Sequence, residues 1–157
     1  MKFQSIRFYM LVLCSLFLIS SCAGHKSRRS RVDTVIKTAR TYTGTPYKWG
    51  GTTRSGMDCS GLLLNSFKSI NYKIPRTSAE QSKIGKKIAK SGIKPGDLVF
   101  FATGKKKRKV THVGLVTEVR GKDNIKFIHA SSSVGVTESN LASDYYKKRF
   151  RQARRIL

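Results

Sequence analysis

The chain has few acidic residues and few cysteines, and both shortages restrict what it can be. Asp and Glu account for 8 of its 157 residues against 32 Lys and Arg, which gives a formal charge of +24. A charge of this size indicates which partners the protein can attract and how soluble it is, but it does not indicate the fold. The chain is also too short for two domains with separate cores, whereas one compact domain fits.

Long apolar runs are absent except near the start of the chain. Lys2 and Arg7 accompany an apolar stretch over 8–19, which is too short to cross a bilayer as a stable helix. Small residues and a cysteine follow in Ile19-Ser20-Ser21-Cys22, a tetrapeptide that resembles a bacterial lipobox. These three parts, in this order, predict a lipoprotein signal peptide over 1–21.

The chain has three cysteines, and the predicted signal peptide accounts for two of them. Cys14 leaves with the signal, and Cys22 becomes the lipid-bearing first residue of a mature chain of 136 residues. Cys59 is then the one remaining thiol, so no disulfide forms within the mature chain, and a reactive role explains an unpaired thiol. The alternatives are an ordinary signal peptide cut near Ala23 or an uncleaved anchor.

The mature chain divides into a tether and a domain. Residues 22–31 are polar and basic without periodic apolar positions, which predicts a flexible tether. A single domain over 32–157 follows, in which helical patterns come first and alternating patterns later. This order predicts an α+β domain with N-terminal helices packed on a C-terminal antiparallel sheet. We expect helices over 32–42, over 58–69 and after the Thr77/Glu80 capping box, strands near 98–101, 110–119, 125–130 and 149–156, and a basic hairpin tip over 104–109.

Asp58-Cys59-Ser60-Gly61 lies where a glycine-rich turn becomes an apolar helix. The first N–H groups of a helix carry partial positive charge, so we expect the pKa of the Cys59 thiol to fall below the ~8.5 of a free cysteine. The thiolate is the nucleophilic form, and the Asp58 carboxylate suits the helix cap. A small, inert buried cysteine is the plainer alternative.

Two histidines follow in apolar, alternating segments, His112 in 110–116 and His129 in 125–130. A cysteine followed by distant histidines is the order expected for a cysteine hydrolase whose site is assembled by folding. Histidines in strands are more often ordinary core or surface residues. Their combination with a lone thiol at a helix start favours catalysis.

Six motifs, in order, resemble those of the NlpC-type peptidases of bacterial cell walls. The resemblance covers roughly residues 32–157, and the signal peptide with the C-terminal residues is most similar to the murein endopeptidase lipoproteins of that family. The motifs are Tyr47-Lys-Trp-Gly-Gly51, Asp58-Cys-Ser-Gly61, Pro75-Arg-Thr-Ser78, Pro95-Gly-Asp-Leu98, His112-Val-Gly-Leu115 and Ile128-His-Ala130.

The resemblance implies a compact papain-like fold and a role for each matching residue. Cys59 matches the nucleophile, His112 the general base, His129 the residue that orients the base, and Tyr47 a tyrosine near the oxyanion. Acyl transfer to sulfur and then to water needs no metal or organic cofactor. The connection over 119–126 is longer than the family pattern leads us to expect.

The residues beside the nucleophile have two interpretations each. Asp58 and Ser60 could meet substrate amine or amide groups, or Asp58 could only cap its helix. Arg76 could bind a substrate carboxylate with two hydrogen bonds, or be an ordinary loop arginine. We expect Trp49 to pack under the turn, with lining of a cleft as the less favoured alternative.

The resemblance implies a peptidoglycan endopeptidase that cleaves D-amino-acid-containing stem or cross-link peptides, with D-Ala–diamino acid cross-links preferred. The alternatives are a γ-D-glutamyl–diamino acid endopeptidase, a papain-like lipid acyltransferase or amidase, and a cationic wall- or nucleic-acid-binding protein. An export signal argues against nucleic acid as a partner, and the basic runs contain no interleaved aromatic residues.

The expected partners are therefore peptidoglycan stem peptides, the membrane through lipid on Cys22, and anionic wall polymers, and we expect a monomer. We expect the protein in the bacterial cell envelope. Ala23 and Gly24 follow Cys22 without an aspartate, which by resemblance implies the periplasmic face of the outer membrane in a Gram-negative cell.

Overall fold

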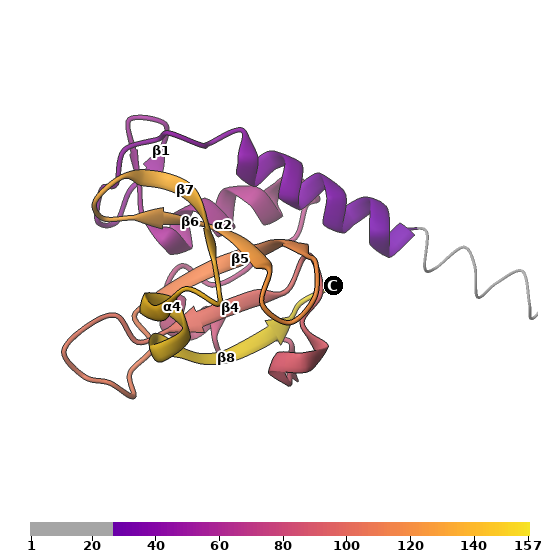
Figure 1. Cartoon of the computed structure of the whole chain (residues 1–157). Helices are drawn as coiled ribbons and strands as arrows, with labels where there is room; N and C mark the ends of the chain where they lie inside the picture. The colour runs from indigo at the N-terminus through magenta and orange to yellow at the C-terminus, as the bar shows by residue number, and fades with distance from the viewer. Residues whose placement is uncertain (1–26) are drawn as a thin grey trace, which may run out of the picture. The chain divides into compact units, whose positions relative to one another are not determined.

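A computed structural model describes residues 27–157, and Val32–Leu157 forms one compact unit (Figure 1). The predicted signal peptide over 1–21 and the lipid site at Cys22 lie outside the described residues. Of the predicted tether over 22–31, residues 27–31 are helical and continue into a helix that ends at residue 40. No helix in the described part of the chain is long and apolar enough to span a membrane.

The centre of the unit is an antiparallel sheet of six strands in the order β3-β8-β4-β5-β6-β7. Helices precede most of these strands in sequence, so the predicted α+β class is confirmed. The strands are β3 (Lys86–Ile88), β4 (Leu98–Phe101), β5 (His112–Val119), β6 (Ile125–Ser131), β7 (Gly135–Asn140) and β8 (Phe150–Arg155). The other elements are a hairpin of β1 (Thr52–Thr53) and β2 (Gly56–Met57), the helices α2 (Cys59–Lys68), α3 (Ser78–Gln81) and α4 (Asp144–Arg149), and the 3-10 turn η1 (Lys90–Gly92).

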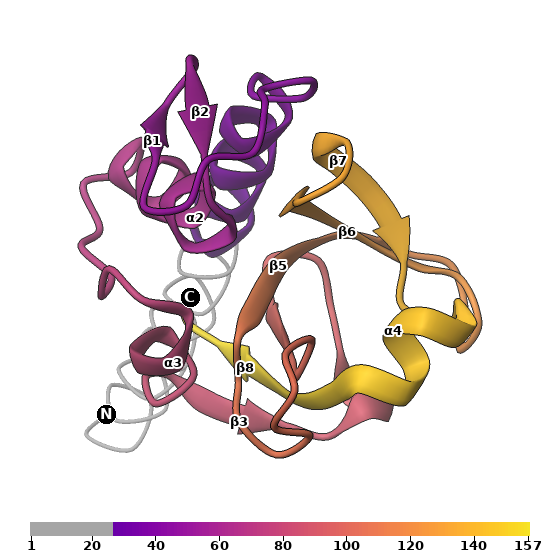
Figure 2. The same cartoon turned by 90° about the vertical axis from the view of Figure 1, so that its left-hand side faces the viewer.

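Both faces of the sheet are buried, which explains why β4 is a continuous apolar run. One face packs against α2 and the helix over 32–40, where Leu62, Leu63 and Phe67 are fully buried. The other face forms a second cluster with the segments around Leu141 and α4. Figure 2 shows α2 and α4 on opposite sides of β5 and β6. Side chains alternate along a strand, so successive residues of β5 and β6 enter different clusters.

Two motif glycines permit close approaches near the start of α2 and of β5. A Cβ on Gly61 would lie 2.3 Å from the carbonyl oxygen of Gly51, because the first turn of α2 packs directly on the glycine-rich turn. A Cβ on Gly114 would lie 2.4 Å from the ring of Phe127 on the neighbouring strand. Both positions therefore exclude a side chain.

The predicted helix over 58–69 and the Thr77/Glu80 capping box are confirmed by α2 and α3. The predicted strands correspond to β4, β5, β6 and β8, and the basic run over 104–109 lies in the β4–β5 connection. Strand β7 and helix α4 were not predicted from the sequence. Their positions matter, because both supply side chains to the site described next.

Candidate active site

Cys59 is the first residue of α2 and is 7% exposed. The backbone N–H of Val113, the residue after His112, forms a hydrogen bond with its thiol, which places the sulfur at the start of β5. Burial raises the pKa of the Cys59 thiol to about 11, and the negative charge of Asp58 adds to the effect. The prediction of a lowered thiol pKa was wrong, because desolvation outweighs the hydrogen bonds from helix-start amides.

The Asp58 carboxylate, at the N-cap of α2, is held by five hydrogen bonds. Its Oδ1 accepts from the Gly61 N–H at 2.6 Å, the Ser60 hydroxyl at 3.0 Å and Arg76 Nη1 at 3.0 Å. Its Oδ2 accepts from Arg76 Nη2 at 2.7 Å and the Gly50 N–H at 3.0 Å. Burial alone would raise the pKa of Asp58, but the hydrogen bonds and charge of Arg76, with those from Gly61 and Ser60, lower it.

The two histidines predicted from sequence meet on the opposite side of the site. His112 Nε2 and His129 Nδ1 are 3.0 Å apart, and the rings are nearly perpendicular, at 84°. The β5–β6 ladder pairs Leu115 with Ile128, so the antiparallel register makes the histidines diagonal neighbours just beyond the last pair. The hydrogen bond to His129 leaves Nδ1 as the remaining ring nitrogen of His112.

His129 has further partners that the sequence analysis missed. Its Nε2 lies 3.0 Å from the Ser139 hydroxyl of β7 and 3.1 Å from the Tyr146 hydroxyl of α4. Ser139 pairs with Phe127 across the β6–β7 ladder, so an alternation analysis that recognised β7 would place Ser139 on the His129 side. The sequence of the six-residue helix α4 contains no local pattern that would identify Tyr146 as a partner of His129.

The surroundings of both imidazoles favour their neutral forms. Burial lowers the pKa of His112 to about 3, with the neighbouring His129 adding to the effect. It also lowers the pKa of His129 to about 4. His129 is 1% exposed and lies among aromatic rings, with ring centroids of Phe127 and Tyr146 at 5.0 and 5.3 Å. Burial therefore favours the uncharged forms of the thiol and of both imidazoles in the free protein.

A cleft connects the cysteine side to the histidine side. A cavity of about 250 Å³ borders Cys59, Asp58 and Arg76, and one of about 630 Å³ borders His112 and His129. Both are lined by Tyr47, Trp49 and Thr111. Trp49 is 85% exposed, so the prediction that it packs under the turn was wrong. The short Gly50-Gly51 turn behind it offers no core for an indole.

Nothing in residues 27–157 groups three or more His, Cys, Asp or Glu side chains in a way that could hold a metal ion. The chemistry that the described site presents is that of a thiol, two neutral imidazoles, a tyrosine hydroxyl and an ion pair between Asp58 and Arg76. These groups suit covalent acyl transfer.

Comparisons with known proteins agree with this arrangement. Residues 44–155 match the NlpC/P60 family. The probable endopeptidase NlpC of Escherichia coli K12 is 39% identical over 158 residues, which cover 94% of this chain and 99% of that protein. The murein DD-endopeptidase MepS/murein LD-carboxypeptidase of the same strain is 39% identical over 115 residues, covering 73% of this chain and 57% of that protein.

A solved NlpC/P60 structure from Bacillus cereus is 35% identical, with a TM-score of 0.71 over 80% of this chain and 40% of that chain. The family match covers most of the described domain, and the fold agrees with that of solved members. On this evidence the chain belongs to the NlpC/P60 family of cysteine peptidases.

Proposed function

We propose that Cys59 is the nucleophile, His112 the general base and His129 the residue that orients it. The observation that carries this proposal is the 3.0 Å contact between His112 Nε2 and His129 Nδ1 beside a buried thiol at the start of α2. For Nδ1 of His112 to accept the thiol proton, its Nε2 must carry a hydrogen and donate to His129 Nδ1. His129 then carries its own hydrogen on Nε2.

The reaction begins from the neutral pair. As the Cys59 sulfur attacks the carbonyl carbon, its proton moves to Nδ1 of His112, which becomes an imidazolium. The C–N bond then breaks, and His112 returns the proton to the leaving amine, which leaves a thioester on Cys59. Water attacks the thioester while His112 takes a water proton, and that proton returns to sulfur as the acid product leaves.

We propose that the backbone N–H of Cys59 and the Tyr47 hydroxyl bind the oxyanion of the tetrahedral intermediate. Burial raises the pKa of Tyr47, and the neighbouring Cys59 and Asp58 add to the effect. The hydroxyl therefore keeps its proton at neutral pH and can donate a hydrogen bond. Each donor to an oxyanion contributes roughly 3 kcal/mol to transition-state stabilisation.

Substrate contacts beside the nucleophile come from the Asp58–Ser60–Arg76 cluster. The Asp58 carboxylate already accepts five hydrogen bonds, and Ser60 both donates to Asp58 and accepts from Arg76 Nη1 at 2.9 Å. Arg76 uses three of the five N–H groups of a guanidinium in these bonds. We propose that Asp58 and Ser60 orient the guanidinium, whose remaining N–H groups bind a substrate carbonyl or carboxylate.

We propose that the substrate is the cross-link between D-Ala and a diamino acid in peptidoglycan. The likeness to a murein DD-endopeptidase over most of the domain supports a peptidoglycan substrate. An open cleft over both sides of the site also suits a branched peptide. Cleavage between D-Glu and the diamino acid is the competing specificity within the same family.

The direct experiment incubates the protein with purified peptidoglycan and with separate cross-linked and uncross-linked stem peptides, and identifies the products by mass. We expect cross-linked dimers to become monomers, while the Cys59→Ala protein yields none. Products cut after D-Glu would replace the proposed bond with the competing one. Absence of any peptide product from the wild-type protein would contradict the peptidase assignment on this substrate.

We also propose that Cys22 carries acyl chains and holds the domain at the membrane, on the periplasmic face of the outer membrane in a Gram-negative cell. The lipobox-like tetrapeptide is the support for this proposal. Several acyl chains, at ~0.8 kcal/mol per buried CH₂, anchor a protein stably. Cys22→Ala should lose labelling by radioactive palmitate and enter the soluble fraction, and a wild-type protein that salt alone removes would contradict the anchor.

We propose anionic wall polymers as a further partner, recognised by a basic rim beside the cleft. The basic rim consists of Lys105, Lys106, Lys107, Arg108 and Lys109 in the β4–β5 loop with Lys147, Lys148 and Arg151. Arg151 Nε donates to the Lys107 carbonyl at 2.6 Å, which ties the loop to β8. Thr103 and Gly104, at the base of the loop, line the cleft itself.

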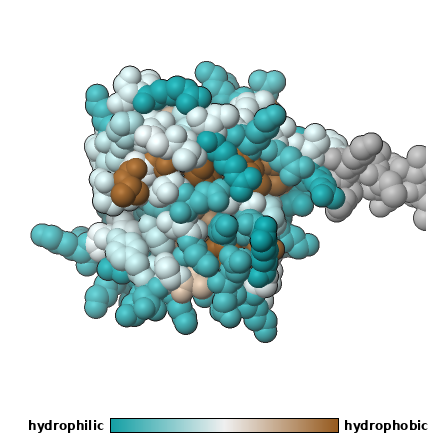
Figure 3. Space-filling model, turned by 45° about the horizontal axis from the view of Figure 1, so that its top comes forward, coloured by the Kyte–Doolittle hydropathy of each residue, from teal (hydrophilic) through white to brown (hydrophobic). Residues whose placement is uncertain are grey.

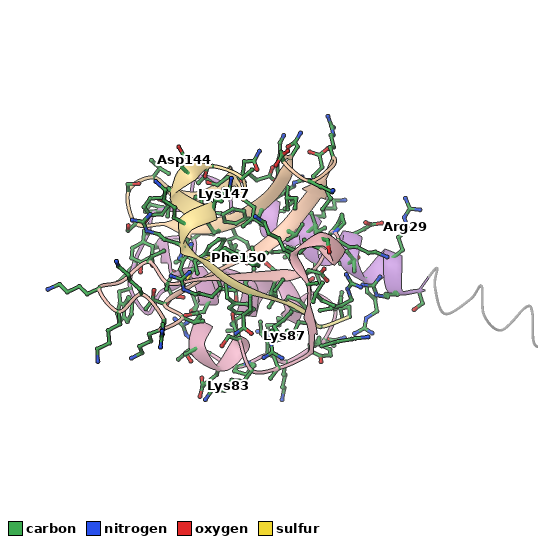
Figure 4. All side chains as sticks on the ribbon, turned by 60° about the horizontal axis from the view of Figure 1, so that its bottom comes forward. Arg29, Lys83, Lys87, Asp144, Lys147 and Phe150 are labelled. Carbon is green, nitrogen blue, oxygen red and sulfur yellow. The ribbon has the colours of Figure 1, made fainter. Side chains whose placement is uncertain are left out.

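The exposed surface of the domain favours a charged partner over an apolar one. Figure 3 shows a face on which hydrophilic residues surround small, separate hydrophobic patches. In Figure 4 long charged side chains project outward from several elements, Lys147 of α4 among them. Exposed basic groups at the edge of a cleft raise the local concentration of an anionic polymer without a defined pocket.

A further inference from the structure

His129 is almost fully buried at the edge of the cleft, and both of its ring nitrogens face protein groups. The side chain is 1% exposed and belongs to the central strand β6. Its Nδ1 faces His112, and its Nε2 faces two hydroxyls, Ser139 Oγ at 3.0 Å and Tyr146 Oη at 3.1 Å. In the Nε2–H form of His129 that the proposed roles require, at least one of these hydroxyls must accept from Nε2, because a buried N–H without an acceptor is costly.

We propose that Ser139 and Tyr146 are interchangeable positioning residues, either of which holds His129 in the Nε2–H tautomer that His112 needs. This inference rests on the proposed roles of His112 and His129. A neutral imidazole has one N–H to donate, and here two acceptors lie within reach of it. Ser139 and Tyr146 also form a hydrogen bond with each other, so each hydroxyl has a second partner while it accepts.

Packing and hydrogen bonding act separately on this ring. Tyr146 packs against Phe101, Phe127 and His129 with centroid distances of 5.1, 4.9 and 5.3 Å. A Tyr146→Phe protein keeps these ring contacts and loses one acceptor. Ser139→Ala removes the other acceptor from β7. When both acceptors are gone, the Nδ1–H tautomer becomes competitive, and Nδ1 no longer accepts from His112.

The experiment compares Ser139→Ala, Tyr146→Phe and the double variant in the full chain. Each single variant keeps one acceptor, so we expect a loss in kcat of about threefold or less. The double variant should lose roughly 30- to 100-fold in kcat with little change in KM, which exceeds the product of about ninefold that two independent threefold losses would give. Ser143→Ala with Tyr42→Phe is the matched control, because both residues lie outside the cleft lining, and it should keep wild-type turnover.

A second measurement reads the tautomer directly and does not depend on activity. The 15N chemical shifts of the His129 ring should show Nε2–H in the wild-type and single-variant proteins, and a tautomer mixture in the double variant. Multiplicative kinetics with an unchanged His129 tautomer in the double variant would overturn the proposal. Turnover by a Cys59→Ala protein would instead overturn the proposed catalytic roles, and the 15N result would still decide the role of the hydroxyls.

Discussion

The two ends of the cleft differ in electrostatics, because one stabilises a charged side chain and the other favours neutral ones. At the cysteine end, an ionised carboxylate is kept charged by Arg76, Ser60 and two backbone N–H groups. At the histidine end, aromatic packing removes water, and two imidazoles stay neutral. The charged cluster gives the turn a fixed shape, whereas the apolar enclosure sets the protonation state of the base.

This contrast shows which reactant state the site stabilises. A thiolate–imidazolium pair would need solvent or counter-charges, and the described surroundings of Cys59 and His112 favour the neutral form instead. On the proposed roles, we expect the thiolate to form when substrate enters and the thiol proton moves to His112.

Removal of the nucleophile or the base breaks the proposed reaction itself. Cys59→Ala should reduce turnover of a cross-linked peptide by at least ~10³-fold, and His112→Ala should be nearly as severe. Both proteins should remain folded by circular dichroism, since each change shortens a side chain without disturbing the sheet. Cys59→Ser with wild-type turnover would contradict the thiol mechanism, because serine lacks the nucleophilicity of sulfur at this position.

The pH dependence of thiol alkylation distinguishes a neutral resting pair from an ion pair. The pKa of Cys59 is raised to about 11 by burial, so the thiolate fraction grows about tenfold per pH unit across the neutral range. Iodoacetamide modification of Cys59, followed by mass spectrometry of its peptide, should rise roughly 100-fold between pH 7 and pH 9. A rate that is already constant above pH 6 would reveal a thiolate–imidazolium pair in the free protein.

Arg76→Ala tests how strongly the charged end depends on its cation. The change leaves the partly buried Asp58 carboxylate without its ion-pair partner, and we expect unfolding to become easier by roughly 1–3 kcal/mol in urea. Arg40→Ala is the matched control, because its pair with Glu138 is more exposed, at 49% and 29% for the two side chains. That variant should lose at most ~1 kcal/mol. Equal losses of unfolding free energy in the two variants would show that the Asp58–Arg76 pair stabilises the fold no more than an exposed ion pair does.

Lowering the pH should reduce the free energy of unfolding, because His112 and His129 are held neutral in the folded protein. His112 and His129 have folded-state pKa values of about 3 and about 4, below the ordinary 6.5. Below pH 6.5 the histidines become protonated in the unfolded chain but stay neutral in the folded protein. Their contribution to the free energy of unfolding is therefore complete above pH 6.5 and decreases as the pH is lowered. Each histidine contributes a slope of up to ~1.4 kcal/mol per pH unit.

Urea unfolding between pH 6.5 and pH 5 measures this slope before most carboxylates titrate. His112→Gln should remove about half of it. An unchanged slope in that variant would show that His112 is already protonated in the folded protein, or that other groups control acid unfolding.

Residues whose roles depend on neighbours in sequence could be predicted, and residues placed by distant contacts could not. The Asp58 cap and the Thr77/Glu80 box are local signals and were correct. The pairing of His112 with His129 was expected from the family resemblance, and the antiparallel β5–β6 register explains it. The thiol pKa was wrong because the local helix-start rule ignores tertiary burial. Ser139 was missed because in β7 only Gly135 and Val136 are buried.

The smallest effect on chemistry should come from the basic rim, which lies beside the neutral end of the cleft. Replacing Lys105, Lys106, Lys107, Arg108 and Lys109 with neutral residues should weaken binding to intact wall material and flatten its salt dependence. Exposed charges are screened beyond ~8 Å at physiological ionic strength, so the loop influences encounter with a polymer rather than proton transfer at His112. Turnover of a small soluble stem peptide at saturating concentration should change by less than about twofold. The matched control neutralises five exposed lysines outside the cleft lining, Lys83, Lys86, Lys87, Lys90 and Lys94, of which Figure 4 labels Lys83 and Lys87. If the control weakens wall binding equally, the rim has no special role and net charge alone acts. A large loss on the small peptide would place the loop in the catalytic site.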